Sequence, residues 1–177
     1  LYHLARIHEI CHNFRNSSLN FIEIGGGFGN LARIILQYDL CDQYYIVDHP
    51  AMHAVQYFFL GEFLPESEIA VTSENGKYIT GNRDSKIQLY SSFSFADSLK
   101  TKTQKPFMLV STMALTEIPT EHQNAYLDFF SPELVYIFGQ LQNVALGGGK
   151  SAAGACFSNE ALILSLGEKF HTIDYKF

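Results

Sequence analysis

The spacing of apolar residues divides the first part of the chain into a helix, a strand and a second helix. Over residues 1–14 four apolar side chains recur at helical spacing and predict a leading helix with one buried stripe: Leu4, Ile7, Cys11 and Phe14. The polar stretch RNSSLN ends it, and the short run FIEI predicts a buried strand. A second amphipathic helix follows, with an apolar stripe at Leu31, Ile34, Ile35 and Tyr38.

The next segment repeats this order. YYIV predicts a second strand that ends at Asp48, and Pro50 suits the first turn of a third helix, where its missing N–H is harmless. Its expected core face carries Met52, Val55, Phe59 and Phe63. Residues 66–85 are polar and contain the turn signals ENG and GNRDS, which predict an insertion in the form of a hairpin.

Three further strands are predicted, with helical stretches between them: KIQLYSS, PFMLVST and ELVYIFGQ. In TEHQ, Thr120 is expected to cap a helix that bears Tyr126, Leu127 and Phe130, while the Gln123 side chain reaches back. Ser131 and Pro132 end that helix. The last part, 144–177, reads as a small flexible loop, a helix and a strand.

Alternation of strands and helices predicts an α/β fold, in which a mostly parallel sheet is covered by helices on both faces. The chain is expected to be a single domain over 1–177, with a leading helix within 1–18, a ligand-binding core over 20–143 and a C-terminal part over 144–177. Because it opens on Leu1 in a helical pattern, we expect a segment of a longer protein.

Composition narrows the classes of function. The 177 residues carry a formal net charge of -6 without a block of Lys or Arg, which argues against nucleic acid as a partner. No apolar run approaches the ~20 residues that span a bilayer, and no signal peptide is recognisable. Three widely spaced cysteines without CxxC spacing suit a reducing compartment. We therefore expect a soluble, cytoplasmic protein that binds no membrane.

The stretch FIEIGGGFGN holds the most informative chemistry. Four glycines between a strand and a helix allow unusual backbone dihedrals and close approach of a ligand to the main chain: Gly25, Gly26, Gly27 and Gly29. Their G-x-G-x-G spacing differs from the dinucleotide pattern, because Asn30 stands where a third dinucleotide glycine would be. The spacing disfavours NAD as the ligand.

Two acids accompany the glycines. A negative Glu23 would repel a diphosphate and attract a ligand that carries an ammonium group. Asp48, at the end of the second strand, is placed to accept hydrogen bonds from both hydroxyls of a ribose. These residues favour a zwitterionic nucleoside.

With these motifs the sequence resembles the class I S-adenosylmethionine-dependent methyltransferases, in which an acid precedes x-G-x-G-x-G and a second acid ends the next strand. EIGGGFG and VD match both features. FIEIGGGFGNLARIIL, YYIVDHPAMHAVQYFFL and STMALTEIP look like the sugar O-methyltransferase family, which is tied to polysaccharide modification. The resemblance covers roughly residues 20 to 140 and implies a Rossmann-like fold, S-adenosylmethionine as cofactor and a small-molecule or glycan acceptor.

The resemblance also implies roles for individual residues. Glu23 would lie near the methionine amino group, the glycine backbone would pack on the cofactor, and Asp48 would bind the ribose. Phe28 and His49 would line the pocket, and the adenine contact would come from Ser92, Phe93 or Asp97. After the fourth strand, the candidates for contacts with the methionine part and the acceptor are Ser111, Thr112 and Glu117.

Methyl transfer to a hydroxyl requires alignment and a proton acceptor. Either Glu117 or His122 can take the acceptor proton, and we prefer Glu117. Residues just past the fifth strand are candidates for hydrogen bonds to a polyhydroxylated acceptor: Gln140, Gln142 and Asn143.

Several alternatives stay open. HEICH, from His8 to His12, matches a zinc hydrolase motif with Glu9 as base, although no third ligand is evident and we expect no metal site. GGGKS at 147–151 lacks the first glycine of a phosphate loop. The glycines alone could form a structural turn, and Asp48 alone could cap the helix that follows it. Glu117 and His122 could be ordinary solvated surface residues. A methyltransferase-like domain that binds without catalysis is the non-enzymatic alternative.

Overall fold

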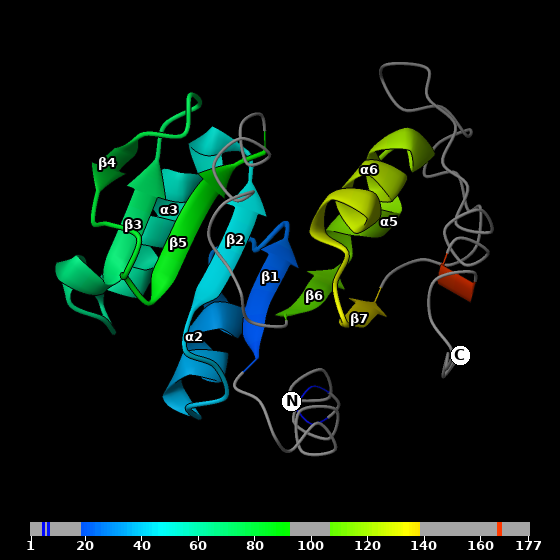
Figure 1. Ribbon diagram of the computed structural model, residues 1–177. Coiled ribbons are helices and arrows are strands. Elements are labelled where there is room, and N and C mark those ends of the chain that lie inside the picture. The colour runs from blue at the N-terminus through cyan, green and yellow to red at the C-terminus, as the bar shows by residue number, and fades with distance from the viewer. Residues whose placement is uncertain (1–4, 6, 8–18, 93–106, 139–165, 168–177) are drawn as a thin grey trace.

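Figure 1 shows the computed structural model of the chain, which describes Ala5, Ile7 and residues 19–92, 107–138 and 166–167. Within these residues seven strands form one sheet in the order β4-β3-β5-β2-β1-β6-β7. All neighbouring strands are parallel except β4, which runs antiparallel to β3. The strands are β1 (Asn20–Ile24), β2 (Tyr44–Asp48), β3 (Ile69–Thr72), β4 (Tyr78–Thr80), β5 (Ile87–Ser91), β6 (Phe107–Thr112) and β7 (Leu134–Phe138).

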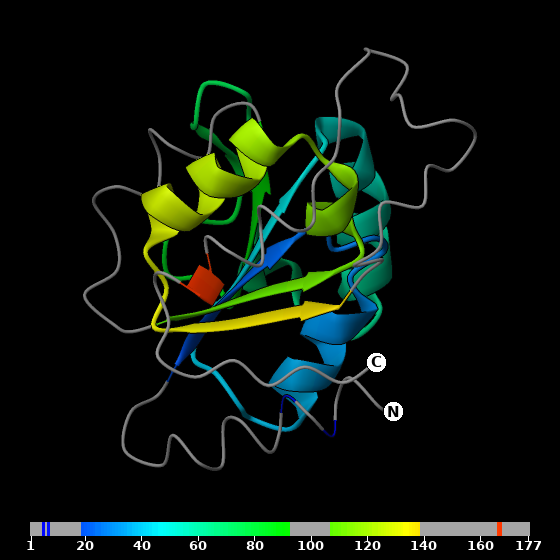
Figure 2. The ribbon, with the colours of Figure 1, turned by 90° about the vertical axis from the view of Figure 1, so that its right-hand side faces the viewer.

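Helices cover both faces of the sheet, as Figure 2 shows, with α6 on one side and α2 and α3 on the other. The helices are α2 (Asn30–Gln37), α3 (Pro50–Gly61), the 3-10 helix η1 (Glu66–Glu68), α5 (Ala114–Glu117) and α6 (Thr120–Phe130). The predicted α/β fold with a mostly parallel sheet is therefore confirmed.

Alternate residues of β1 and β2 enter two separate hydrophobic cores, because successive side chains of a strand point to opposite faces. Phe21 and Ile46 pack with Ile35 of α2 and Leu60 of α3. On the other face, side chains from the same strands pack with α6: Ile22, Ile24, Tyr45, Val47, Leu127 and Phe130. Both strands are thus packed against helices on both faces of the sheet.

The polar insertion at 66–85 contains the predicted hairpin. Strands β3 and β4 pair antiparallel, and β3 also pairs in parallel with β5. The hairpin therefore widens the sheet beyond β5 at the edge away from β1.

The predicted core face of α3 is displaced by one residue, although Phe59 packs against the core as predicted. His53, Gln56 and Leu60 are buried, whereas Val55 is 47% exposed. One residue corresponds to a rotation of about 100° around a helix axis. The helix is apolar on most of its surface, so the pattern alone does not mark which side meets the sheet.

Two other helix details also differ from prediction. Helix α6 begins at Thr120 with Pro119 as its cap residue, and the Gln123 amide donates to the Leu115 carbonyl at 2.9 Å, so the capping box is wrong. Ser131, with φ 42°, ends α6 as expected. Tyr38 lies just after α2 and is 64% exposed, because the buried side of that helix is formed by Ala32 and Ile35.

Some predicted elements lie outside the described residues. Of the leading helix the structure describes only Ala5 and Ile7, both helical, and Ile7 is buried in the core of Phe21. The C-terminal strand at 171–177 is outside, as is the C-terminal helix apart from residues 166–167, which are helical. No helix within the described ranges is long and apolar enough to cross a bilayer.

Candidate functional site

The glycine loop and Asp48 lie next to each other at the carboxyl ends of two neighbouring strands. Strands β1 and β2 are parallel neighbours, with Ile24 beside Val47, so the residues that follow them emerge side by side. The Gly25 N–H donates to the Val47 carbonyl at 2.9 Å and ties the loop to β2. The sequence prediction that these two features converge holds.

Three of the four glycines have positive φ, at 75° for Gly25, 55° for Gly27 and 95° for Gly29. A Cβ added at Gly25 would lie 2.2 Å from the Ala114 Cβ, and one added at Gly26 would lie 2.6 Å from Ile46. Apart from Gly27 itself and its two neighbours in the chain, no atom of the described residues lies within 4 Å of a Cβ added at Gly27. Packing therefore requires Gly25 and Gly26, while Gly27 presents bare main chain to open space.

The Asp48 carboxylate is held at both oxygens. Its Oδ1 accepts from the His49 N–H at 2.7 Å, and its Oδ2 accepts from the Gln56 amide at 2.8 Å. Since each carboxylate oxygen has two lone pairs, further acceptor capacity remains for two hydroxyls. The cap of α3 is His49, whose exposed ring accepts from the Ala51 N–H at 3.2 Å, so the helix-cap interpretation of Asp48 is wrong.

Glu23 lies beneath the glycine loop and is 1% exposed. Its Oε2 accepts a hydrogen bond of 3.0 Å from the Tyr44 hydroxyl and would lie 3.2 Å from a Cβ at Gly26. Burial raises the pKa of Glu23 to about 8, the Tyr44 hydrogen bond opposes that rise, and the charge of Asp48 adds to it. The raised pKa opposes the expectation of a negative Glu23, whose contact with a cofactor amino group stays a prediction.

At the end of β6 the two predicted residues differ in their surroundings. The buried Ser111 hydroxyl donates to the Ile24 carbonyl at 3.2 Å and accepts from the Leu115 N–H at 2.9 Å, so it joins β1, β6 and α5. Thr112 is partly exposed. Met113 follows with φ 91°, a conformation rare outside glycine, and its N–H donates to the Phe138 carbonyl at 2.6 Å.

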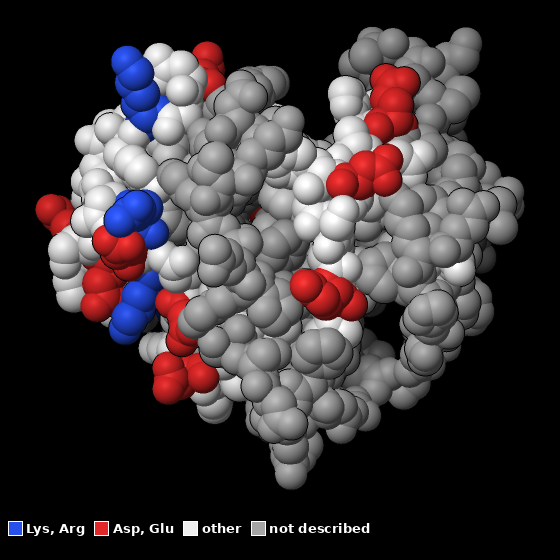
Figure 3. All heavy atoms as spheres, viewed as in Figure 1, with Lys and Arg blue, Asp and Glu red and all other residues white. Residues whose placement is uncertain are grey.

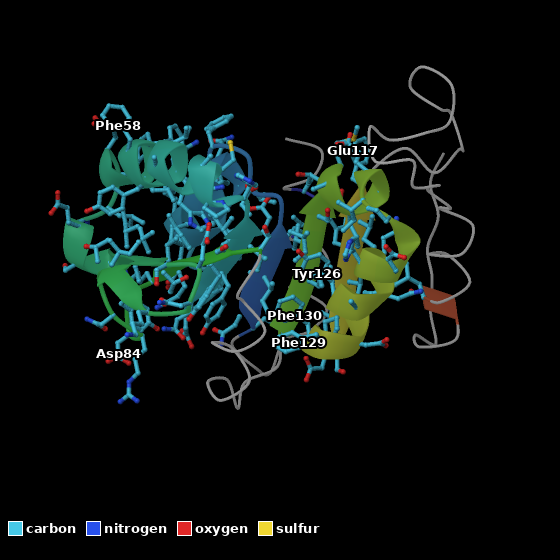
Figure 4. The ribbon with its side chains drawn as sticks, turned by 90° about the horizontal axis from the view of Figure 1, so that it is seen from above. Phe58, Asp84, Glu117, Tyr126, Phe129 and Phe130 are labelled. Atoms are coloured by element: carbon cyan, nitrogen blue, oxygen red, sulfur yellow. The ribbon has the colours of Figure 1, made fainter. Side chains whose placement is uncertain are left out.

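Both predicted proton acceptors are exposed. Glu117 is the last residue of α5, and Figure 4 shows it at the opposite end of the α5–α6 layer from Phe129 and Phe130. His122 is in the first turn of α6, where its N–H donates to the Pro119 carbonyl at 2.9 Å. Their role as bases stays a prediction.

The remaining candidates fall into two groups. Ser92 is partly exposed and its N–H donates to the Asp48 carbonyl at 2.8 Å, while the half-exposed Phe28 ring packs edge-on against Phe59. The following candidates lie outside the described residues: Phe93, Asp97, Gln140, Gln142, Asn143 and the HEICH and GGGKS segments. Within the described part of the chain, no three His, Cys, Asp or Glu side chains are grouped to hold a metal ion.

Two side chains near Asp48 were not predicted from the sequence. Gln56 of α3 donates to the Gly27 carbonyl at 2.9 Å as well as to Asp48. Tyr126 of α6 lies on the side of its helix that faces the sheet (Figure 4), and burial together with the charge of Asp48 raises its pKa. The one available signal was Gln56 itself, a polar residue inside an apolar helix.

A separate groove of about 640 Å³ lies between α3 and the β3–β4 hairpin. Its mainly apolar lining includes Tyr57, Val71 and Ile79 but no glycine of the loop. Because the polar groups described above lie at the ends of β1 and β2, we place the candidate site there and not in this groove.

One solved structure gives the comparison that bears on the fold. The methyltransferase domain of bacterial CtHen1 matches this chain with a TM-score of 0.54 and 18% sequence identity, over 76% of this chain and 63% of that one. The chain thus spans less than two thirds of that structure's length. No protein-family model and no curated protein matches the sequence. At this identity the match shows the fold alone, and the chain has the Rossmann-like fold of a methyltransferase domain.

Proposed function

We propose that this chain is an S-adenosylmethionine-dependent O-methyltransferase that acts on a sugar hydroxyl. The observation that carries the proposal is the joining of the glycine loop and Asp48 at adjacent strand ends through Gln56. Ligands of open α/β sheets bind beyond the carboxyl ends of the strands, where this cluster lies. The match to a methyltransferase domain supports the same reaction class through the fold.

The residues present fit an adenosine cofactor. Gly27 offers bare main chain with open space beside it, and the partly buried Asp48 carboxylate keeps lone pairs for both ribose hydroxyls. The partly exposed residues that would extend the contact surface are Phe28, Ser92 and Thr112. When bound, S-adenosylmethionine supplies an electrophilic methyl group on a sulfonium.

The chain's remaining task is to align the acceptor and take its proton. Glu117 and His122 follow β6, whose carboxyl end lies beside that of β1 in the sheet. Either side chain would accept the proton of the acceptor hydroxyl, and Glu117 is our first choice. General-base assistance of this kind typically contributes ~10²–10⁴-fold to a rate.

Charge supports a neutral acceptor over a polyanion. Residues 107–138 contain no Lys or Arg but contain four acids: Glu117, Glu121, Asp128 and Glu133. In Figure 3 the described surface over α5 and α6 shows acidic groups and no basic ones. A phosphate-rich acceptor would be repelled there, whereas the hydroxyls of a sugar can donate hydrogen bonds to carboxylates.

The test is to incubate purified protein with methyl-labelled S-adenosylmethionine and separate panels of glycans, small alcohols and RNA. Label on a hydroxyl of a glycan is the expected result. Cofactor binding without transfer would favour the non-catalytic alternative, and transfer to RNA alone would contradict the sugar acceptor. Stoichiometric zinc that is lost in His8→Ala would favour the hydrolase instead.

A further inference from the structure

We propose that Gln56 is a positioning residue that holds the glycine loop and Asp48 in the geometry that binds the cofactor. The inference rests on the proposed function and adds a residue from α3 to it. No sequence motif marks Gln56, which is 29 residues from Gly27 and eight from Asp48 along the chain.

One side-chain nitrogen serves both elements of the site. The buried Gln56 Nε2 donates to the Gly27 carbonyl at 2.9 Å and to Asp48 Oδ2 at 2.8 Å. A primary amide nitrogen carries two protons, so each acceptor receives one. Because one acceptor belongs to the glycine loop and the other to the last residue of β2, the amide fixes their separation.

The amide can face these groups in only one orientation. With the opposite orientation Oε1 would meet a carbonyl and a carboxylate, which are both acceptors. In the observed orientation Oε1 is buried without a hydrogen-bond partner among the described residues. A buried acceptor without a partner costs free energy. The two hydrogen bonds donated by Nε2 therefore stabilise this orientation by more than the unpaired Oε1 costs.

Both partners of Gln56 are otherwise poised for a ligand. Gly27 has positive φ and open space on its Cβ side, and Gln56 bonds its carbonyl. Asp48 is held at its second oxygen by the His49 N–H, so its carboxylate is restrained at two points. Restraint of binding groups before the ligand arrives reduces the ordering that binding requires. Loss of the amide should therefore weaken binding as well as packing.

Gln88 provides a matched control. It is also buried, its Nε2 donates to the carbonyls of Asn82 and Ser85 at 2.9 Å each, and its Oε1 likewise has no partner among the described residues. Its partners belong to the segment between β4 and β5, away from the glycine loop. Gln88→Met therefore removes a similar pair of buried bonds without touching the candidate site.

The experiment compares S-adenosylmethionine affinity, by calorimetry, with thermal stability in the wild type, Gln56→Met and Gln88→Met. We expect Gln56→Met to raise the Kd about tenfold or more, in line with the loss of a hydrogen bond to a charged group. Gln88→Met should lower the melting temperature but leave the Kd unchanged. An unchanged Kd in Gln56→Met, or an equal rise in Gln88→Met, would overturn the positioning role. A wild type that binds no cofactor would instead overturn the proposed function.

Gln56→Glu adds a second measurement, the pH dependence of cofactor affinity, which should not change if Gln56 has only a structural role. Above neutral pH the introduced carboxylate would face Asp48 and repel it, whereas at lower pH a proton shared by the pair restores one hydrogen bond. Affinity should therefore recover as pH falls in Gln56→Glu but not in Gln56→Met. Other titratable groups under the influence of Asp48, namely Glu23, His53 and Tyr126, are present in both variants, so the difference isolates position 56. Identical pH profiles would contradict the proposal.

Discussion

The hydroxyl of Tyr44 donates a hydrogen bond of 3.0 Å to Oε2 of Glu23, and both side chains are buried under the glycine loop. Tyr44 begins β2 and Glu23 lies one residue before the end of β1, so the bond links the two strands that carry the candidate site. Burial raises the pKa of both groups, that of Glu23 to about 8. Burial thus favours the protonated form of the acid in the glycine motif.

Glu23→Gln should remove a pH dependence of stability. The folded-state pKa of about 8 lies above the ordinary value of 4.5, so the folded state binds this proton more tightly than the unfolded chain does. Its stabilising contribution is complete below pH 4.5 and is lost as pH rises to about 8. In urea titrations between about pH 5 and about pH 8, the wild type should lose free energy of unfolding that Glu23→Gln retains. Parallel pH profiles for the two proteins would exclude this account of Glu23.

Asp48→Ala should weaken S-adenosylmethionine binding by about 1–3 kcal/mol, the usual loss for hydrogen bonds to a charged group. Calorimetry measures the change directly. Asp84→Ala is the control, because that exposed carboxylate belongs to the hairpin region and lies 3.7 Å from the Arg83 Nε. Equal affinities for the wild type and Asp48→Ala would remove Asp48 from the site.

Gly25→Ala and Gly27→Ala should separate folding from binding. The Gly25 methyl would meet Ala114 at 2.2 Å, and such overpacking typically costs ~1–3 kcal/mol in addition to the strain of positive φ. Gly27→Ala should cost only about 1–2 kcal/mol of backbone strain, since no described atom opposes its Cβ. Its methyl would instead occupy the space assigned to the cofactor and lower affinity. Thermal unfolding and cofactor titration of both variants give the comparison, and full affinity in Gly27→Ala would argue against that placement.

Glu117→Gln and His122→Gln should distinguish the two predicted bases. Loss of the true base should lower the rate of methyl transfer by ~10²–10⁴-fold while cofactor affinity stays unchanged. Glu121→Gln is the matched control, because Glu121 is an exposed acid of the same helix as His122. If both variants transfer methyl groups at the wild-type rate, the base is another residue.

The α/β architecture followed from the sequence because its signals are local. The strands, the glycine turn and the polar hairpin segment are each indicated by a pattern of neighbouring residues. Parallel strands then bring their carboxyl ends to the same side of the sheet. The positions of Gly25 to Gly29 and Asp48 at one sheet edge were therefore predictable. The order of strands in the sheet determines which loops lie side by side, and side-chain packing is not needed for that prediction.

By itself the sequence determined where the glycine turn and Asp48 lie, because both are attached directly to strand ends. Tertiary structure alone decided the buried face of α3, the raised pKa of Glu23 and the two hydrogen bonds of Gln56. Burial, pKa and hydrogen bonding depend on neighbours that are distant in the chain, such as Tyr44 for Glu23. An apolar helix pattern does not contain that information, since a rotation of about 100° per residue exchanges one plausible face for another.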